Sequence, residues 1–298
     1  MSTRTKAYLH VRLFYSVSLT MRFFSTLILI VASLSFLNGQ SLKVMTYNIR
    51  LDTQADGVNA WPNRIEKVSG LIRTHNPDII GIQEALHHQL HDLVRLLPDY
   101  SFLGVGRDDG KEKGEYSAIL FRNNRFGLLK DSVFWLSETP EVPGSKSWDA
   151  AITRIVTIAT FYDKELKSDF MVFNTHFDHM GKEARMNSGA LIAGAVANSR
   201  LSQAMPVIVT GDFNCERSEE TYRNLTIRDL ADTKPVNDQT GTFCGFEVGK
   251  MECKAIDYIF HTKEWILKNY RVISDNDDTY YPSDHLPVMV EFELSSEH

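Results

Sequence analysis

The sequence lacks the features that mark several large classes of protein. It has no low-complexity stretch, no block of like charges and no repeat at the spacing of solenoid proteins. It has no H-E-x-x-H motif of a helical zinc peptidase, and His87 and His91 are expected to face solvent. Positive charge is not in excess, because 32 Lys and Arg stand against 38 Asp and Glu, a formal net charge of −6. Tight binding of duplex DNA is therefore not expected, since it depends on cations that neutralise phosphates.

Cysteine is also scarce, with three residues in the chain. Three cysteines allow at most one disulfide, and Cys244 and Cys253 flank a segment, GFEVGKME, that looks like a hairpin. A disulfide and a pair of buried thiols are both compatible with this pattern. Cys215 follows a polar motif and is expected to be a packed thiol rather than a nucleophile.

The long apolar run lies near the N-terminus. Arg22 precedes a stretch, Phe23–Leu37, that is interrupted by small residues. It is shorter than the roughly 20 residues of a membrane-spanning helix, which favours a secretory signal peptide. Residues 1–40 are therefore expected to be a basic leader plus signal peptide, with Met21 as an alternative start, and the protein to be exported (periplasmic or extracellular). Without residues 1–39, which hold four cations and no anion, the formal charge becomes −10.

Apolar periodicity predicts alternating strands and helices after residue 40. Helical spacing is clear in 61–76, where Pro62 stands near the start, and in 183–203. Strands outnumber helices, and helices lie between several of them. This pattern favours an α/β fold with mixed sheets covered by helices, in one domain over 41–298. The expected strands are 42–49, 77–84, 116–122, 152–162, 169–177, 205–214, 255–262, 266–274 and 285–294.

Polar side chains recur where these apolar strands end. Each one alone is better explained as a turn residue, a cap or a satisfied buried group. Together they favour a functional site, because loops at one rim of layered sheets bring strand ends together. The residues are Asn48, Glu84, His176, Asp212, Asn214, Asp257, Asp284 and His285.

Six short blocks carry a resemblance to a known superfamily. They are TYNIR, PDIIGIQEAL, NTHFDH, VTGDFN, IDYIF and PSDHLPV, spread over residues 42–294. In this order they resemble the endonuclease/exonuclease/phosphatase superfamily, and WPNRIEKV before the second block is similar to its nocturnin/deadenylase branch. The resemblance implies a deoxyribonuclease I-like four-layer sandwich, with two packed mixed β-sheets flanked by helices and the site at one rim.

Hydrolysis of a phosphate ester needs charge neutralisation, an activated water and a stabilised leaving oxygen. The oxygen-rich donors, with no pair of thiolates among them, favour Mg²⁺, or Mn²⁺ in its place, over zinc. Mg²⁺ is usually held by one or two carboxylates, so Glu84 is the expected main ligand. The resemblance implies that Asn48 and Asp284 complete or adjoin this metal site.

The resemblance also implies catalytic roles. His285 matches the active-site histidine, as general base or as charged phosphate contact, and Asp257 is its orienting carboxylate. Asp284 is expected to point the other way, toward the metal, because neighbours on an extended chain face opposite sides. Asp212 orients or deprotonates the attacking water, and Asn214 holds a phosphate oxygen. The two are two residues apart and would share a face of an extended segment.

Other residues near these blocks are candidates for substrate contact. His176 is expected to donate to the phosphate or the leaving oxygen, with Glu115 as its candidate partner. Arginine suits phosphate and tryptophan suits ring stacking, whereas core packing and surface ion pairs explain the same residues equally well. The substrate candidates are Arg50, Arg64, Glu115, Trp148, Arg154, His179 and Arg185.

The sequence thus predicts an exported, Mg²⁺-dependent hydrolase of phosphate esters that uses direct attack of water. A 3′–5′ exoribonuclease-like activity is the favoured subclass, and a phospholipid-headgroup hydrolase or a sugar-phosphate or inositide phosphatase is the alternative. An inactive relative that only binds a phosphorylated ligand is less favoured, because no metal carboxylate or histidine is missing. The expected partner is the substrate (nucleic acid, phospholipid or sugar phosphate), with no stable protein partner.

Overall fold

The computed structural model describes residues 40–201, 204–249 and 251–296. The predicted leader and signal peptide lie outside these residues. The strands are β1 (Ser41–Asn48), β2 (Ile79–Ala85), β3 (Tyr100–Leu103), β4 (Tyr116–Arg122), β5 (Phe126–Trp135), β6 (Ile155–Asp163), β7 (Ser168–His176), β8 (Val207–Asp212), β9 (Ala231–Asp232), β10 (Asp257–His261), β11 (Trp265–Val272) and β12 (Val288–Leu294). The helices are η1 (Gln54–Asn59), α2 (Trp61–His75), α3 (His87–Leu96), α4 (Lys182–Ser199) and α5 (Glu220–Thr226). In this part of the chain, no helix is both long and apolar enough to cross a membrane.

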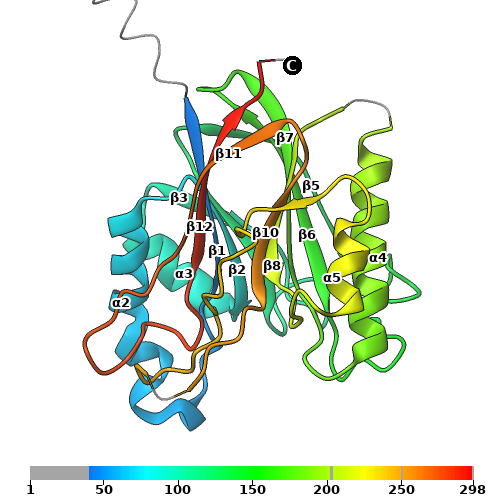
Figure 1. Cartoon of the computed structure of the whole chain (residues 1–298). Coiled ribbons are helices and arrows are strands. Elements are labelled where there is room, and N and C mark those ends of the chain that lie inside the picture. The colour runs from blue at the N-terminus through cyan, green and yellow to red at the C-terminus, as the bar shows by residue number, and fades with distance from the viewer. Residues whose placement is uncertain (1–39, 202–203, 250, 297–298) are drawn as a thin grey trace, which may run out of the picture. The chain divides into compact units, whose positions relative to one another are not determined.

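The strands form two mixed sheets of the same design. Their orders are β11-β12-β1-β2-β4-β3 and β5-β6-β7-β8-β10-β9. Each sheet has one parallel pair, β1–β2 in the first and β7–β8 in the second, among antiparallel neighbours. Helices α2 and α3 cover the outer face of the first sheet, and α4 and α5 cover that of the second (Figure 1). The predicted four-layer sandwich is confirmed.

Alternation of side chains along each strand divides the apolar residues among three cores. In β1, Leu42 and Val44 pack between the two sheets, whereas Met45 and Tyr47 pack beneath α2 and α3. The second sheet divides its side chains in the same way, with a third core beneath α4 and α5. All strands that reach the site therefore send every second residue into the space between the sheets.

That space changes from apolar to polar toward one rim. Asn174 of β7 donates through Nδ2 to the carbonyls of Ile82 and Ala118 in the opposite sheet, both at 2.8 Å. Its Oδ1 accepts hydrogen bonds from Gln83 Nε2 at 2.7 Å and Thr210 Oγ1 at 3.0 Å. These groups are fully buried, and their hydrogen bonds meet the desolvation cost of placing them there. The network fixes how the two sheets align beneath the rim.

The sequence prediction missed elements whose patterns are weak. Strand β5 lies at a sheet edge, and the middle of the strand is exposed, so it lacks the alternation of a half-buried strand. The short strand β3 and the seven-residue helix α5 were also missed. The last strand begins at Val288, after Pro287, rather than at His285. Asp284 and His285 therefore lie in the preceding loop.

The close approach of the sheets generates a prediction at Gly81. A Cβ at this position would lie 2.5 Å from Asn174 Oδ1 and 2.8 Å from Thr210 Cβ. Gly81→Ala is therefore expected to lower the free energy of unfolding by about 3 kcal/mol, because the buried network must move apart. Gly194→Ala is the matched control, since an added Cβ meets nothing within 4 Å in α4 and should stabilise by about 0.5–1 kcal/mol. Urea denaturation of the three proteins measures both, and equal stability of Gly81→Ala and wild type would contradict this account.

Candidate functional site

A cavity of about 510 Å³ opens at the polar rim, a size common for small-molecule sites. Strand register brings part of its lining together. His176 at the end of β7 is the direct partner of Asp212 at the end of β8, and Asp212 is in turn opposite Asp257 in β10. Of the strand-end residues, Glu84, His176, Asp212, Asn214, Asp284 and His285 line the cavity. Asn48 and Asp257 are buried and contact these lining groups.

Glu84 reaches the cavity because β2 is irregular near its end. Simple alternation would send Glu84 toward the helix side, opposite to Gln83. The register between β2 and β4 shifts after Ile82, and Glu84 has a φ of 63°, a conformation that non-glycine residues rarely adopt. Irregular pairing of this kind re-aims a side chain. Here it places a carboxylate at the site at some cost in backbone strain.

Asn48 joins the two sheets at the centre of the site. Its Nδ2 donates to Glu84 Oε1 of the first sheet and to Asp212 Oδ2 of the second, both at 3.0 Å, and lies 3.5 Å from His285 Nε2. Its Oδ1 accepts from the backbone N–H of Arg50 at 3.0 Å. Of the two positions that the resemblance implies, the structure therefore places Asn48 beside the expected metal site. In this orientation, the amide nitrogen holds two carboxylates together, and the amide oxygen accepts the hydrogen bond from Arg50.

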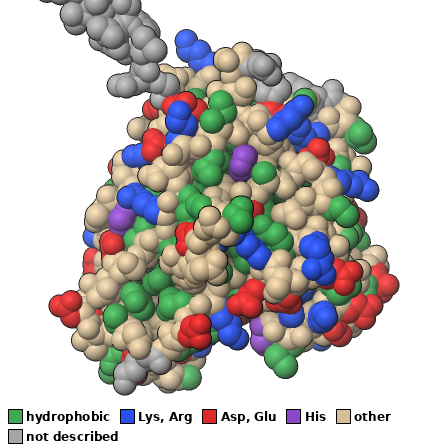
Figure 2. All heavy atoms as spheres, in the orientation of Figure 1, with side chains coloured by type: hydrophobic (Ala, Val, Ile, Leu, Met, Phe, Trp, Pro, Cys, Tyr) green, Lys and Arg blue, Asp and Glu red, His purple; other side chains and the backbone are tan. Residues whose placement is uncertain are grey.

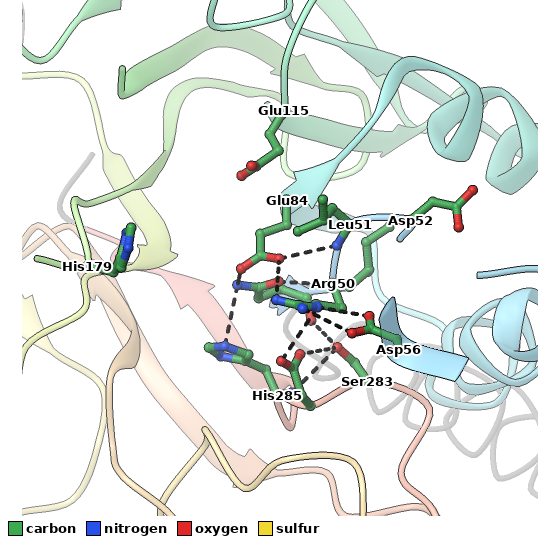
Figure 3. A network of polar contacts seen from close by, with 12 residues as sticks. Arg50, Leu51, Asp52, Asp56, Glu84, Glu115, His179, Ser283 and His285 are labelled. Carbon is green, nitrogen blue, oxygen red and sulfur yellow. Dashed lines mark hydrogen bonds and ion pairs between the residues drawn. The ribbon is translucent and has the colours of Figure 1, made fainter. Parts of the chain in front are cut away.

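Arg50 lies among the acidic groups of the expected metal site (Figure 3). Its guanidinium makes two hydrogen bonds of 3.0 Å to Asp56. It is also 3.8 Å from Glu84 Oε2 and 4.0 Å from Asp284 Oδ2. Glu84 and Asp284 thus both face the Arg50 guanidinium, which provides part of the positive charge that they need. The divalent ion that the sequence places between them stays a prediction.

The donor set is compatible with a divalent metal ion. Ligand atoms of Glu84, His176 and Asp212 lie within 4.8 Å of one another. Burial and the nearby Asp257 carboxylate raise the pKa of Asp212 well above that of a free carboxyl group. Burial likewise raises the pKa of Asp284, with His285 opposing the rise and Glu84 adding to it. A bound cation would relieve this crowding of carboxylates.

His285 forms a charged pair with Asp257. Its Nδ1 lies 2.9 Å from Asp257 Oδ2, while its Nε2 is 3.7 Å from Asp212 Oδ2. Burial alone would lower the pKa of His285, but the Asp257 and Asp212 carboxylates outweigh it and raise the pKa well above the usual value. His285 is therefore an imidazolium near neutral pH. Asp284, its neighbour in the chain, faces Arg50 instead, so the two adjacent residues serve different partners, as predicted.

His176 has the opposite electrostatic character. Burial, reinforced by the positive charges of Arg154 and Arg107, lowers its pKa well below the usual value and keeps the ring neutral. Its Nε2 lies 3.1 Å from Asn214 Nδ2 and 3.4 Å from Asp212 Oδ2. The site therefore contains one charged and one neutral histidine.

The backbone conformation that brings Asn214 to the site differs from the expected one. The segment after β8 is not extended, because Asn214 has a φ of 47° and its N–H donates to Asp212 Oδ1 at 3.0 Å. This is a tight turn closed by the aspartate side chain. The expected extended geometry was wrong, although the turn still directs the Asn214 amide toward His176.

Three of the predicted substrate candidates besides Arg50 line the cavity. They are Glu115, Arg154 and His179. Glu115 pairs with Arg107, whose Nη1 lies 2.7 Å from Glu115 Oε2, so the structure gives it a different partner from the expected His176. Arg154 Nη2 lies 3.4 Å from His179 Nδ1.

The other candidates do not line the cavity. Arg64 is buried beneath the site, where it donates to the carbonyls of Ile49, Arg50, Asn59 and Pro282 and so supports the loops around the metal site. Trp148 is half-buried in the loop before β6. Arg185 donates to the carbonyl of Asp178 and lies 3.6 Å from Glu219 Oε2. Their contacts with protein groups explain Arg64 and Arg185 without substrate.

A disulfide-closed loop supplies a wall that the sequence did not reveal. Cys244 and Cys253 form a disulfide with a Cα–Cα distance of 4.3 Å. Phe243 and Lys254, the residues immediately outside the two cysteines, pair as a β-bridge, and both line the cavity. The Phe243 ring lies 4.9 Å from the His285 ring. The available sequence signal was the pair of cysteines, but it did not show which surface the loop covers.

Known proteins match this architecture over most of the chain. The sequence profile of the Endonuclease/Exonuclease/phosphatase family matches residues 45–285. A solved endonuclease/exonuclease/phosphatase family protein from Bacteroides thetaiotaomicron is 36% identical with a TM-score of 0.81, covering 87% of this chain and 99% of its own. A mannosyl-6-phosphatase from the same organism is 36% identical with a TM-score of 0.79, covering 85% and 100%.

More distant relatives share the fold. The human nocturnin catalytic domain, solved with a bound sulfate anion, is 23% identical with a TM-score of 0.68, covering 86% of this chain and 94% of its own. Mouse nocturnin is 22% identical over 86% of this chain and 66% of its own length. The profile match and the 36% identical structures, together with the geometry of the rim, show that the chain is a hydrolase of the endonuclease/exonuclease/phosphatase family.

Proposed function

We propose that the protein hydrolyses a phosphate monoester of a small polyol, such as a sugar, with the help of Mg²⁺ or Mn²⁺. The cavity is the observation that carries this proposal. Besides its polar groups, the lining includes Ile152, Phe243, Lys254 and Ile256, which can contact a small leaving group. The 36% identity to a mannosyl-6-phosphatase supports the same substrate class.

Each residue of the site has a different role in the proposed hydrolysis. Asp212, with its raised pKa, accepts the proton of the attacking water. The His285 imidazolium, held by Asp257, donates to a phosphoryl oxygen as the negative charge there increases. Of the two roles that the sequence left open for His285, the charged contact is thus favoured over the general base. Asn214 and His176, whose side-chain nitrogens are 3.1 Å apart, stand beside the remaining oxygens, to which the amide of Asn214 donates when it turns away from His176.

Glu84 and Asp284 would hold the metal ion, with Asp212 and His176 close by. A bound divalent ion supplies charge neutralisation at the phosphoryl oxygens and at the leaving oxygen. Arg50 keeps the Glu84 and Asp284 carboxylates near each other, and Asn48 does the same for Glu84 and Asp212.

The cavity lining and the face shown in Figure 2 do not favour a long nucleic acid as substrate. On the face shown in Figure 2, Lys and Arg side chains are scattered among acidic ones rather than gathered in a continuous track. Apart from the histidines, the cavity lining contains one aromatic side chain, that of Phe243. Proteins that bind single-stranded nucleic acid stack successive bases on several aromatic side chains. The 3′–5′ exoribonuclease-like subclass is therefore the alternative that a substrate panel must test. Export remains a proposal supported by residues 1–40 and by the disulfide, which suits an oxidising compartment.

A panel of substrates tests the proposed class. Purified protein with Mg²⁺ should release inorganic phosphate from hexose phosphates at least about tenfold faster than it degrades short RNA or phospholipids, because the cavity suits a small leaving group. EDTA should abolish the activity and added Mg²⁺ should restore it. Activity confined to RNA would support the exoribonuclease alternative instead of the proposed substrate class. Turnover unaffected by EDTA would exclude a metal-dependent reaction.

Glu84→Gln tests the metal site. The substitution keeps the size of the side chain and removes its charge, so we expect kcat/KM to fall by about 100-fold or more and Mn²⁺ affinity to weaken. Calorimetric titration with Mn²⁺ and steady-state kinetics measure the two effects. Glu66→Gln, an exposed carboxylate on α2, is the matched control and should behave as wild type. Wild-type affinity for Mn²⁺ in Glu84→Gln would contradict the assignment.

Asp257→Asn tests the charged state of His285. Removing the carboxylate lowers the raised pKa of His285, so its proton is lost at lower pH. The alkaline limb of the kcat/KM profile should therefore move to lower pH, and the maximum should fall by about 100-fold or more. The alkaline limb lies at higher pH than the second ionisation of a phosphate monoester, which has a pKa of about 6. Ionisation of the substrate therefore does not account for this limb. Asp131→Asn, on the exposed edge strand β5, is the control, and an alkaline limb that does not move would exclude His285 as the charged contact.

A further inference from the structure

One end of the cavity holds a buried arginine without a carboxylate partner. Arg154, just before β6, is 5% exposed and lines the cavity beside His176. Its guanidinium makes a long contact of 3.4 Å with His179 Nδ1, while its Nε is buried and has no hydrogen-bond partner. Among the described residues, no carboxylate lies within ion-pair distance of it.

The nearby carboxylate is already used. Glu115 accepts from Arg107 at 2.7 Å. Glu115, Asp212 and Asp178 act on Arg154 only from beyond ion-pair distance, so its positive charge has no carboxylate in direct contact. Burial of an arginine without a counter-charge is unfavourable, and arginine does not relieve it by losing its proton. A group that binds here must therefore be anionic for this charge to be compensated.

The shape of this end limits what the anion can be. Arg154, His176 and Glu115 also line a second, separate recess of about 10 Å³, together with Arg107, Tyr116 and Ser117. That volume is about enough for one water molecule. A terminal phosphoryl oxygen can point in this direction, whereas an ester substituent cannot follow it.

Charge is also distributed unequally across the site. Glu84 and Asp284 lie beside Arg50, whereas Arg154 contacts His179 and lines a small recess together with His176 and Glu115. His176 also lies within 4.8 Å of Glu84 and Asp212. A phosphate beside His176 is therefore next to both the carboxylates and the Arg154 guanidinium. The planar guanidinium fork matches two phosphate oxygens at once.

We propose that Arg154 binds the non-bridging oxygens of the substrate phosphate and makes the site selective for dianionic phosphate monoesters over diesters. This inference rests on the proposed function and adds to it a residue that distinguishes substrates by the charge of their phosphate group. A monoester presents a second negative charge and a third terminal oxygen to this end of the cavity. A diester has one negative charge and only two terminal oxygens.

The test compares Arg154→Met with Arg154→Lys and wild type. Binding of inorganic phosphate, measured by calorimetry in the presence of Mg²⁺, should weaken by about 30-fold in Arg154→Met and by less in Arg154→Lys, which keeps the charge but loses the fork. The value of kcat/KM for p-nitrophenyl phosphate should fall by a similar factor. That for bis(p-nitrophenyl) phosphate should fall several-fold less, because a diester carries less charge. Arg95→Met removes an exposed cation from α3 and should leave all three quantities unchanged.

Two results overturn the inference. Wild-type affinity for phosphate in a folded Arg154→Met shows that Arg154 does not bind the anion. Equal losses on monoester and diester in both variants show that it does not select between them. Thermal unfolding midpoints establish folding, and Arg154→Lys decides the question if Arg154→Met does not fold. Failure of the proposed function is a separate result, because the wild-type protein would then release no p-nitrophenol from the monoester p-nitrophenyl phosphate, whatever its activity on the diester.

Discussion

The side chain of Asn48 connects the two sheets where the site is built. One amide nitrogen contacts a carboxylate from each sheet, Glu84 and Asp212, and lies near His285. Such a position is available because every second residue of β1 enters the space between the sheets, where Leu42 and Val44 are apolar and Asn48 at the strand end is polar. If the sheets slid relative to each other, the carboxylates would lose their common donor, and the Asn174 network below would lose its partners as well. The alignment of the sheets is therefore the constraint on which the site depends.

The site uses burial to give similar groups different charges. His285 and His176 are both buried at the rim, yet two carboxylates keep the first protonated, and two arginines help to keep the second neutral. Asp257 pairs directly with His285, and burial together with this neighbouring carboxylate raises the pKa of Asp212. Groups whose environments push their pKa values apart are suited to act as acid and base in one reaction. The arrangement matches the demands of hydrolysis of a phosphate ester near neutral pH.

Much of this architecture could be predicted from the sequence, and the reasons are local. Buried strands such as β2 are continuous apolar runs, and their ends are marked by polar residues that the fold gathers at one rim. Edge strand β5 was missed because its middle residues face solvent and show no periodicity. Sequence could not show that Arg64 supports backbone carbonyls instead of substrate, or that Glu115 pairs with Arg107, because partner choice depends on three-dimensional distance. The wall formed by Phe243 and Lys254 was hidden for the same reason, although the disulfide that closes the loop was one of the two alternatives.

The central claim is that carboxylates from distant segments surround one divalent ion at the rim between the sheets. A crystal structure of the protein soaked with Mn²⁺, with anomalous diffraction data that locate the ion, measures this directly. The account predicts one strong anomalous peak in contact with a Glu84 oxygen, with Asp284 close enough to be a direct or water-mediated ligand. A saturated crystal with no peak at Glu84, or with manganese bound only at a distant surface site, would contradict it.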